Sequence, residues 1–87
     1  MRAAIDQFGD ELKGRSIVFT GAGIHKANIR EALASKHQFT YSTRVAPNTE
    51  LLVAGTEQTD TQQLAKAREL GIPIMIETTF WRRLGEV

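Results

Sequence analysis

The hydrophobic positions of this chain fall into short continuous runs, and these runs predict the strands of a sheet. Ile17, Val18 and Phe19 are consecutive and apolar, which is typical of a strand buried on both faces by covering helices. Phe39 and Tyr41 alternate with polar neighbours, so this segment is predicted to be a shorter strand at an edge of the sheet. The predicted strands cover residues 15–20, 39–41, 51–53 and 74–76.

Between these runs, apolar residues recur at spacings of three and four, which is the pattern of amphipathic helices. One helix is predicted over residues 27–36, a second opens at Asp60 and ends at Gly71, and a third begins near Thr78. Asp60 followed three residues later by Gln63 resembles a capping box, and Gly71 is typical of a left-handed helix end. The inward faces are expected to be Ile29, Ala32 and Leu33; Leu64, Ala67 and Leu70; and Phe80, Trp81 and Leu84, whereas Lys26, Arg30, Glu31 and Lys36 are expected to face water.

The order strand, helix, strand, strand, helix, strand, helix predicts an α/β fold with a four-stranded parallel sheet flanked by helices. Right-handed crossovers then determine the topology. Ile5, Phe8 and Leu12 have helical spacing and predict a short extra N-terminal helix, which is either a capping helix or the remnant of a linker. Residues 1–12 are therefore assigned to this helix or linker, and residues 13–87 to the domain.

Composition limits the classes of function. With 87 residues, 41% of them apolar, the chain suits a single small domain with a modest core. It contains no cysteine, which excludes disulfides, thiolate catalysis and cysteine-bound metals and agrees with a reducing, cytoplasmic location. No apolar run approaches the roughly 20 residues that span a bilayer, and no signal-peptide run is seen, so no membrane association is expected.

The formal net charge of +1 provides no general attraction to nucleic acid, so DNA binding would depend on local clusters of basic residues. The candidate clusters are Lys26, Arg30, Lys36 and Arg44; Lys66 and Arg68; and Arg82 and Arg83. Sequence alone favours an ordinary solvated charge at each of these positions over a binding role. His25 and His37 have no partner at the spacing of a metal site or a catalytic triad, and the acidic residues are scattered. No catalytic residue, metal site or cofactor is therefore expected.

The end of the first strand carries the candidate for ligand chemistry. Thr20 and Gly21 stand between an apolar strand and a helix, where a hydroxyl and unpaired backbone N–H groups suit an anion such as phosphate. The alternative is that these two residues only end a buried strand and turn the chain. A dinucleotide-binding motif and a P-loop are both excluded, because Lys26 stands where either motif requires glycine.

Three segments, in this order and at these separations, resemble the BRCT domain family. They are Lys13-Gly14 leading into Ile17-Val18-Phe19-Thr20-Gly21, then residues 45–55, and then residues 64–74. Phe80, followed by Trp81, stands where the family places a large aromatic residue in its last helix. The match spans roughly residues 12–84 and is most like the single BRCT domains of bacterial NAD-dependent DNA ligase and of replication factor C large subunit. The resemblance implies a β-α-β-β-α-β-α fold and a non-catalytic module of a DNA replication or repair protein.

The resemblance also implies a ligand, a DNA 5′-phosphate end, and the residues that hold it. These are Thr20, Gly21, Gln63 and Lys66 for the phosphate, and Arg15, Lys26 and Arg30 for the nearby DNA backbone. BRCT domains that bind phosphate typically use a lysine at the position of Gln63, and a neutral amide weakens such binding by roughly tenfold. Lys66 or Lys26 is therefore expected to supply the missing charge.

The alternative is a protein-interaction module, reading a phosphopeptide or independent of phosphate, that tethers a larger polypeptide. In either case the domain is expected to be a monomer in the cytoplasm, near the nucleoid if the source is bacterial, with a parent such as a ligase or an exonuclease.

The family commonly has Gly-Gly where this chain has Lys36-His37. Because a left-handed cap without glycine costs about 1 kcal/mol, a different turn is expected there.

Overall fold

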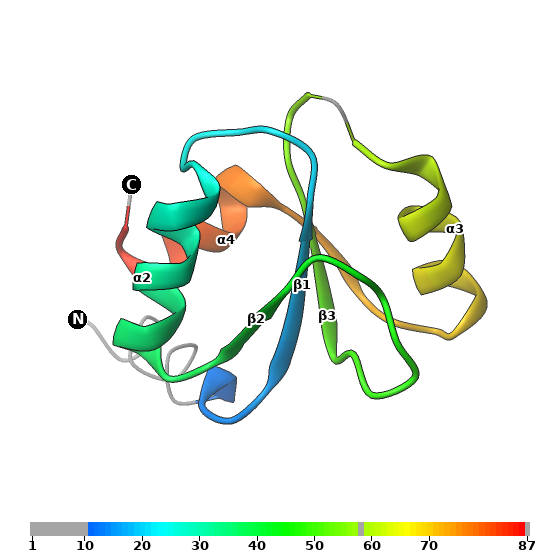
Figure 1. Ribbon diagram of the computed structural model, residues 1–87, viewed down its shortest axis with the longest axis horizontal. Coiled ribbons are helices and arrows are strands. Elements are labelled where there is room, and N and C mark those ends of the chain that lie inside the picture. Colours follow the sequence, from blue (N-terminus) through cyan, green and yellow to red (C-terminus); the bar gives the residue numbers. More distant parts are fainter. Residues whose placement is uncertain (1–10, 58, 87) are drawn as a thin grey trace.

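Parallel strands form the sheet at the centre of the fold, in the order β2-β1-β3-β4 (Figure 1). The computed structural model describes residues 11–57 and 59–86. The strands are β1 (Ser16–Thr20), β2 (Thr40–Ser42), β3 (Leu51–Ala54) and β4 (Ile74–Ile76). The predicted parallel α/β architecture is confirmed, and β2 lies at an edge of the sheet as expected.

Helices cover both faces of this sheet. They are α2 (Ala27–His37), α3 (Thr61–Glu69) and α4 (Glu77–Leu84). Helices α2 and α4 lie side by side on one face, and α3 covers the other (Figure 1). The predicted N-terminal helix depends on Ile5 and Phe8, which lie outside the described residues. None of the helices in the described part of the chain has the length and apolar character needed to cross a bilayer.

The two faces of β1 account for two hydrophobic clusters. Phe19 points toward α2 and α4, where its ring centroid lies 5.5 Å from those of Phe80 and Trp81. Val18 points the other way and packs in the cluster that includes Ala67 of α3. Successive side chains of a strand alternate between faces, so a sheet covered on both sides requires a continuous apolar run. Phe80 and Trp81 are 0% exposed, which confirms their predicted place on the inner face of the last helix.

The inner face of α2 differs from the one that hydrophobic spacing predicts. Ile29 is 42% exposed and Ala32 is also exposed, so both of these predicted inward residues face water. Arg30 and Ala34 are buried instead, and the prediction that Arg30 faces water is wrong. The reason is that the buried carboxylate of Glu77 pairs with the guanidinium, which allows the helix to turn a charged residue inward.

The boundaries of α3 follow its predicted caps. Asp60 accepts hydrogen bonds from Gln62 N and Gln63 N, which confirms the cap at the start of the helix. Gly71, just after the helix, has a φ of +73° and so provides the predicted left-handed end. Leu70 was expected on the inner face but is 41% exposed, because the helix ends before it and the chain turns away.

The turn after α2 forms without glycine. Gln38 has a φ of 64°, and its N–H donates to Ser35 O at 3.2 Å. The left-handed conformation is therefore retained, and the expectation of a different turn is wrong. Phe39, the next residue, donates its N–H to Ala34 O and buries its side chain in the core, which offsets the strain at Gln38.

Glu86, just beyond α4, is bonded to the last turn of α2. Its carboxylate accepts hydrogen bonds from Lys36 Nζ at 2.7 Å and His37 Nε2 at 2.8 Å. The hydrogen bond from Lys36, with a smaller contribution from that of His37, outweighs partial burial and lowers the pKa of Glu86 below its ordinary value of 4.5. This contact ties the end of α4 to α2.

We expect Glu86 to make the stability of the domain depend on pH in the acid range. A carboxyl whose pKa is lower in the folded than in the unfolded chain stabilises the fold fully above its unfolded pKa, and this contribution is lost as pH falls through the folded pKa. Unfolding of the wild type and of Glu86→Gln, compared from about pH 7 to about pH 3, should show a stability difference that shrinks as the pH falls. A difference that stays constant over this range would contradict the role of Glu86.

Candidate functional site

The carboxyl edge of the sheet holds the two residues singled out at the end of the first strand. Thr20 ends β1, and Gly21 follows it with a φ of +83°. A methyl group on Gly21 would lie 2.6 Å from Glu57 O, so this turn requires glycine. Helix α3 begins beside this pair, because Asp60 N donates to Thr20 Oγ1 at 3.0 Å.

The Gly21 N–H is a donor at this edge that has no acceptor among residues 11–57 and 59–86. Thr40 N of β2 donates to Arg15 O, so the backbone of Arg15 faces β2. Every second residue of a strand directs its backbone N–H and C=O toward the same neighbouring strand. Gly21 lies an even number of residues after Arg15, and its N–H therefore also points toward the side of β2. Strand β2 ends at Ser42, before it provides an acceptor for Gly21. No residue in the described ranges accepts a hydrogen bond from Gly21 N.

The Thr20 hydroxyl and the start of α3 are already engaged by the protein. Thr20 is 6% exposed, and its oxygen accepts from Asp60 N, so the hydroxyl keeps its proton to donate. The Asp60 carboxylate accepts from Gln62 N and Gln63 N, which occupies two of the first N–H groups of α3. Two N–H groups at the tip of the helix are therefore engaged, whereas Gly21 N has no acceptor among the described residues.

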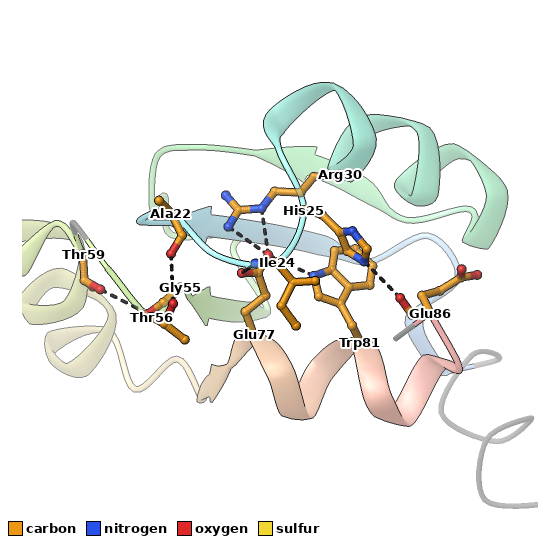
Figure 2. A network of polar contacts seen from close by, with 10 residues as sticks. All are labelled: Ala22, Ile24, His25, Arg30, Gly55, Thr56, Thr59, Glu77, Trp81 and Glu86. Carbon is orange, nitrogen blue, oxygen red and sulfur yellow. Dashed lines mark hydrogen bonds and ion pairs between the residues drawn. The ribbon is translucent and has the colours of Figure 1, made fainter.

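The loop over residues 21–26 is held on both sides, as Figure 2 shows in part. On one side, Ala22 and Glu57 exchange backbone hydrogen bonds of 2.6 and 3.0 Å. On the other side, Ile24 N donates to Glu77 Oε1 at 3.1 Å. These contacts determine the position of the first amide of the loop before a ligand binds, which favours affinity because little order has to be gained on binding.

Glu77 is at the centre of the buried polar network in Figure 2. Although it is 0% exposed, its Oε2 accepts from Arg30 Nε and Trp81 Nε1 at 2.9 Å each. The Arg30 guanidinium also lies 5.3 Å from the centroid of the Phe19 ring. Sequence reasoning missed Glu77 by treating the acidic residues as scattered. Glu77 lies four residues before Trp81, so the two side chains share one face of α4. This spacing could have indicated that Glu77 lies on the buried face of the helix.

Gln63 and Lys66 have different surroundings on α3. Gln63 Oε1 accepts from Val45 N at 2.7 Å, so its amide does not return to Asp60 N as a complete capping box requires. Lys66 is exposed on the next turn and has no ion pair with any residue between 11 and 57 or 59 and 86. Gln63 therefore holds the loop that precedes β3, while Lys66 offers an available charge.

The structure does not bring together the three residues implied for the DNA backbone. Arg15 stands at the amino end of β1, about 16 Å along the strand from Thr20, and its Nη1 lies 2.6 Å from Glu50 Oε1. Arg30 is 6% exposed and has no surface to offer a ligand. Lys26, the N-cap residue of α2, is exposed and lies at the carboxyl edge with Gly21.

Comparison with known proteins decides the family. Residues 8–83 match the model of the BRCA1 C Terminus (BRCT) domain. The chain belongs to the BRCT family. It is 38% identical over 74 residues to a DNA ligase of Bartonella bacilliformis, and 34% identical over 80 residues to DNA ligases of Brucella ovis and Brucella abortus. These matches cover 84% and 90% of this chain but only 10% and 11% of the ligases, so the chain spans about a tenth of the length of these relatives.

Membership of the BRCT family confirms the resemblance, and the similarity to DNA ligases is consistent with a DNA-related module. BRCT is a non-catalytic domain type, and the ligases that the chain resembles contain it as one part of a much longer polypeptide. Within the described part of the BRCT domain, no three His, Asp or Glu side chains are grouped so that they could hold a metal ion.

Proposed function

We propose that this BRCT domain binds the phosphorylated 5′ end of DNA at the carboxyl edge of its sheet. In this proposal the chain is non-catalytic, works as a monomer in the cytoplasm, and holds a ligase-like or other DNA repair protein on its substrate. The observation that carries the proposal is the Gly21 N–H, which has no acceptor in the described part of the chain and lies beside the Thr20 hydroxyl.

A phosphate oxygen is the acceptor that suits this donor. The direction of Gly21 N is set by β1, and backbone N–H groups in such turns are known to bind anions. Hydrogen bonds to charged groups contribute about 1.5–3 kcal/mol, against about 1 kcal/mol for neutral ones. The Thr20 hydroxyl proton provides a second donor next to the first.

Exposed cations near this edge favour a terminal phosphate over an internal one. Lys26 precedes α2 and Lys66 lies on α3, and neither has an ion pair in the described part of the domain. A terminal phosphate monoester carries a charge of about −1.5 to −2 at neutral pH, more than the single charge of a phosphodiester. A small site with few cations therefore gains most from a DNA end.

Binding of matched DNA duplexes tests this function. We expect a duplex with a 5′-phosphate to bind about tenfold more tightly than the same duplex with a 5′-hydroxyl. Its affinity should fall with salt at a slope near −0.9 for each phosphate neutralised. Amide spectra should show a shift of Gly21 N–H with the phosphorylated duplex, while Gly14 and Gly71, which lie away from the carboxyl edge, serve as internal controls. Equal affinity for both ends, with no shift at Gly21, would contradict the proposal.

A protein-interaction role is the second candidate, and exposed isoleucines favour it. Ile24 is 46% exposed and Ile76 is 58% exposed. Both lie next to Glu77, because Ile24 N donates a hydrogen bond to the Glu77 carboxylate and Ile76 precedes Glu77 in the sequence. Apolar side chains left in water are typical of surfaces that contact other proteins. A phosphopeptide that shifts Gly21 at lower concentration than the phosphorylated duplex does would favour this second role over DNA binding.

A further inference from the structure

We infer that Arg44 supplies the strong cation of the phosphate site and that Gln63 positions it rather than contacting the ligand. The inference rests on the proposed function and adds to it a residue outside the set that the resemblance implies. Three features of the structure support it: the register of β2 against β1, the anchoring of the loop after β2, and the absence of a partner for the Arg44 side chain in the described ranges.

The register places Arg44 at the same edge as Gly21. The last pair of the β1–β2 ladder is Val18 with Ser42. Two residues further along each strand come Thr20 on β1 and Arg44 after β2. The carboxyl ends of parallel strands meet at one edge of a sheet, and Gly21 N faces the side on which β2 has ended. The backbone donor and the arginine therefore border the same position.

The loop that carries Arg44 is anchored on both sides of this residue. Before it, Ser42 Oγ accepts from Arg44 N at 3.4 Å, a long hydrogen bond. After it, Val45 N donates to Gln63 Oε1 at 2.7 Å, and the Val45 side chain is buried in the cluster beneath α3. Thr49 then closes the next turn, since its Oγ1 accepts from Ala46 N at 2.9 Å. The backbone of Arg44 is thus fixed, which reduces the entropy lost when its side chain binds.

The Arg44 side chain is exposed and has neither an ion pair nor a side-chain hydrogen bond with a described residue. Arg15 and Arg30 differ in this respect, because each is paired with a glutamate. A guanidinium presents donors in a planar fork that matches two phosphate oxygens, so one arginine can replace the charge of a lysine at this site.

The contact between Gln63 and Val45 gives the neutral Gln63 side chain a structural role. The Gln63 amide oxygen accepts the hydrogen bond from Val45 N, and a lysine ammonium has no acceptor with which to do so. One side chain at this position can therefore either bind phosphate or hold the loop. In this chain it holds the loop, and the charge comes from Arg44, next to Val45.

Duplex binding by three variants tests the inference. Arg44→Gln should weaken binding of the 5′-phosphorylated duplex by about tenfold or more and lower the magnitude of its salt slope by about 0.9, with little change for the 5′-hydroxyl duplex. Arg68→Gln, which removes an exposed arginine from the last turn of α3, is the matched control and should bind as the wild type does. Gln63→Leu should weaken binding in the same way, and adding it to Arg44→Gln should cause no further loss.

The outcomes separate this inference from the proposed function. If the wild type prefers the 5′-phosphate and Arg44→Gln binds equally well, Arg44 is not the cation and the inference is overturned while the function stands. If the wild type binds both ends equally, the function fails and the inference fails with it. Arg44 is exposed and outside the core, so its substitution should leave the fold intact, which the amide spectrum of the variant checks.

Discussion

Replacing Glu77 by alanine is expected to lower the free energy of unfolding by about 3–5 kcal/mol. The carboxylate is 0% exposed and accepts hydrogen bonds from Arg30, Trp81 and Ile24. Alanine leaves the Arg30 guanidinium buried without its counterion, and a lone buried charge is strongly destabilising. A small domain has a total stability of about 5–15 kcal/mol, so this single change should remove a large part of it.

Thermal and urea unfolding measure this effect. A loss of about 3 kcal/mol corresponds to a fall in Tm of about 12 °C or more for a domain of this size. Glu31→Ala, an exposed glutamate on α2, is the control and should change stability by less than about 0.5 kcal/mol. Substituting both partners, Arg30→Met with Glu77→Leu, should recover part of the loss, because the unpaired charge is gone while Trp81 Nε1 and Ile24 N still lack their acceptor. A Glu77→Ala domain as stable as the wild type would contradict the role of this network.

Replacing Gly23 by alanine should disturb the same network from the side of the loop. The methyl group would overlap Glu77 Oε1 and force the carboxylate away from its partners. The backbone of Gly23 is outside the left-handed region, so alanine itself is compatible with the turn. We expect a loss of about 2 kcal/mol in the free energy of unfolding, in the range typical of overpacking a filled site.

A double-mutant cycle shows whether this loss comes from the clash with Glu77. In a Glu77→Ala background the alanine at position 23 has room, so the second substitution should cost less than about 0.5 kcal/mol. The effects of Gly23→Ala and Glu77→Ala should therefore be strongly non-additive in urea unfolding. Additive losses would mean that the glycine is required for a reason other than the approach of the carboxylate.

The network also links stability to the proposed binding site. Glu77 holds Ile24 N, and Glu57 pairs with Ala22, so the loop that begins with Gly21 is fixed between α4 and the segment after β3. The buried Glu77 carboxylate therefore helps to determine the position of the loop that carries the Gly21 N–H. Substitutions at Glu77 that leave the domain folded should weaken binding of the phosphorylated duplex through the position of the loop rather than through loss of a direct contact.

Local sequence signals were sufficient for most of the fold. The run Ile17-Val18-Phe19 predicted a strand covered on both faces, and Asp60 predicted the start of α3, because both signals act within a few residues of the chain. Spacing was misleading on α2, where it placed Ile29 inside and Arg30 outside. The residue that reverses this assignment, Glu77, lies 47 positions away in the sequence.

The sequence by itself determined the order of strands and helices, the caps of α3, and the Thr20-Gly21 pair at the end of β1, because propensity, periodicity and capping are properties of neighbouring residues. Only the tertiary structure decided which charges are buried and which remain available. Pairing Arg30 with Glu77 and Gln63 with Val45, and leaving the Gly21 amide past the end of β2, requires segments distant in sequence to meet. These long-range contacts depend on how the sheet and helices pack, and the local periodicity of the sequence does not predict them.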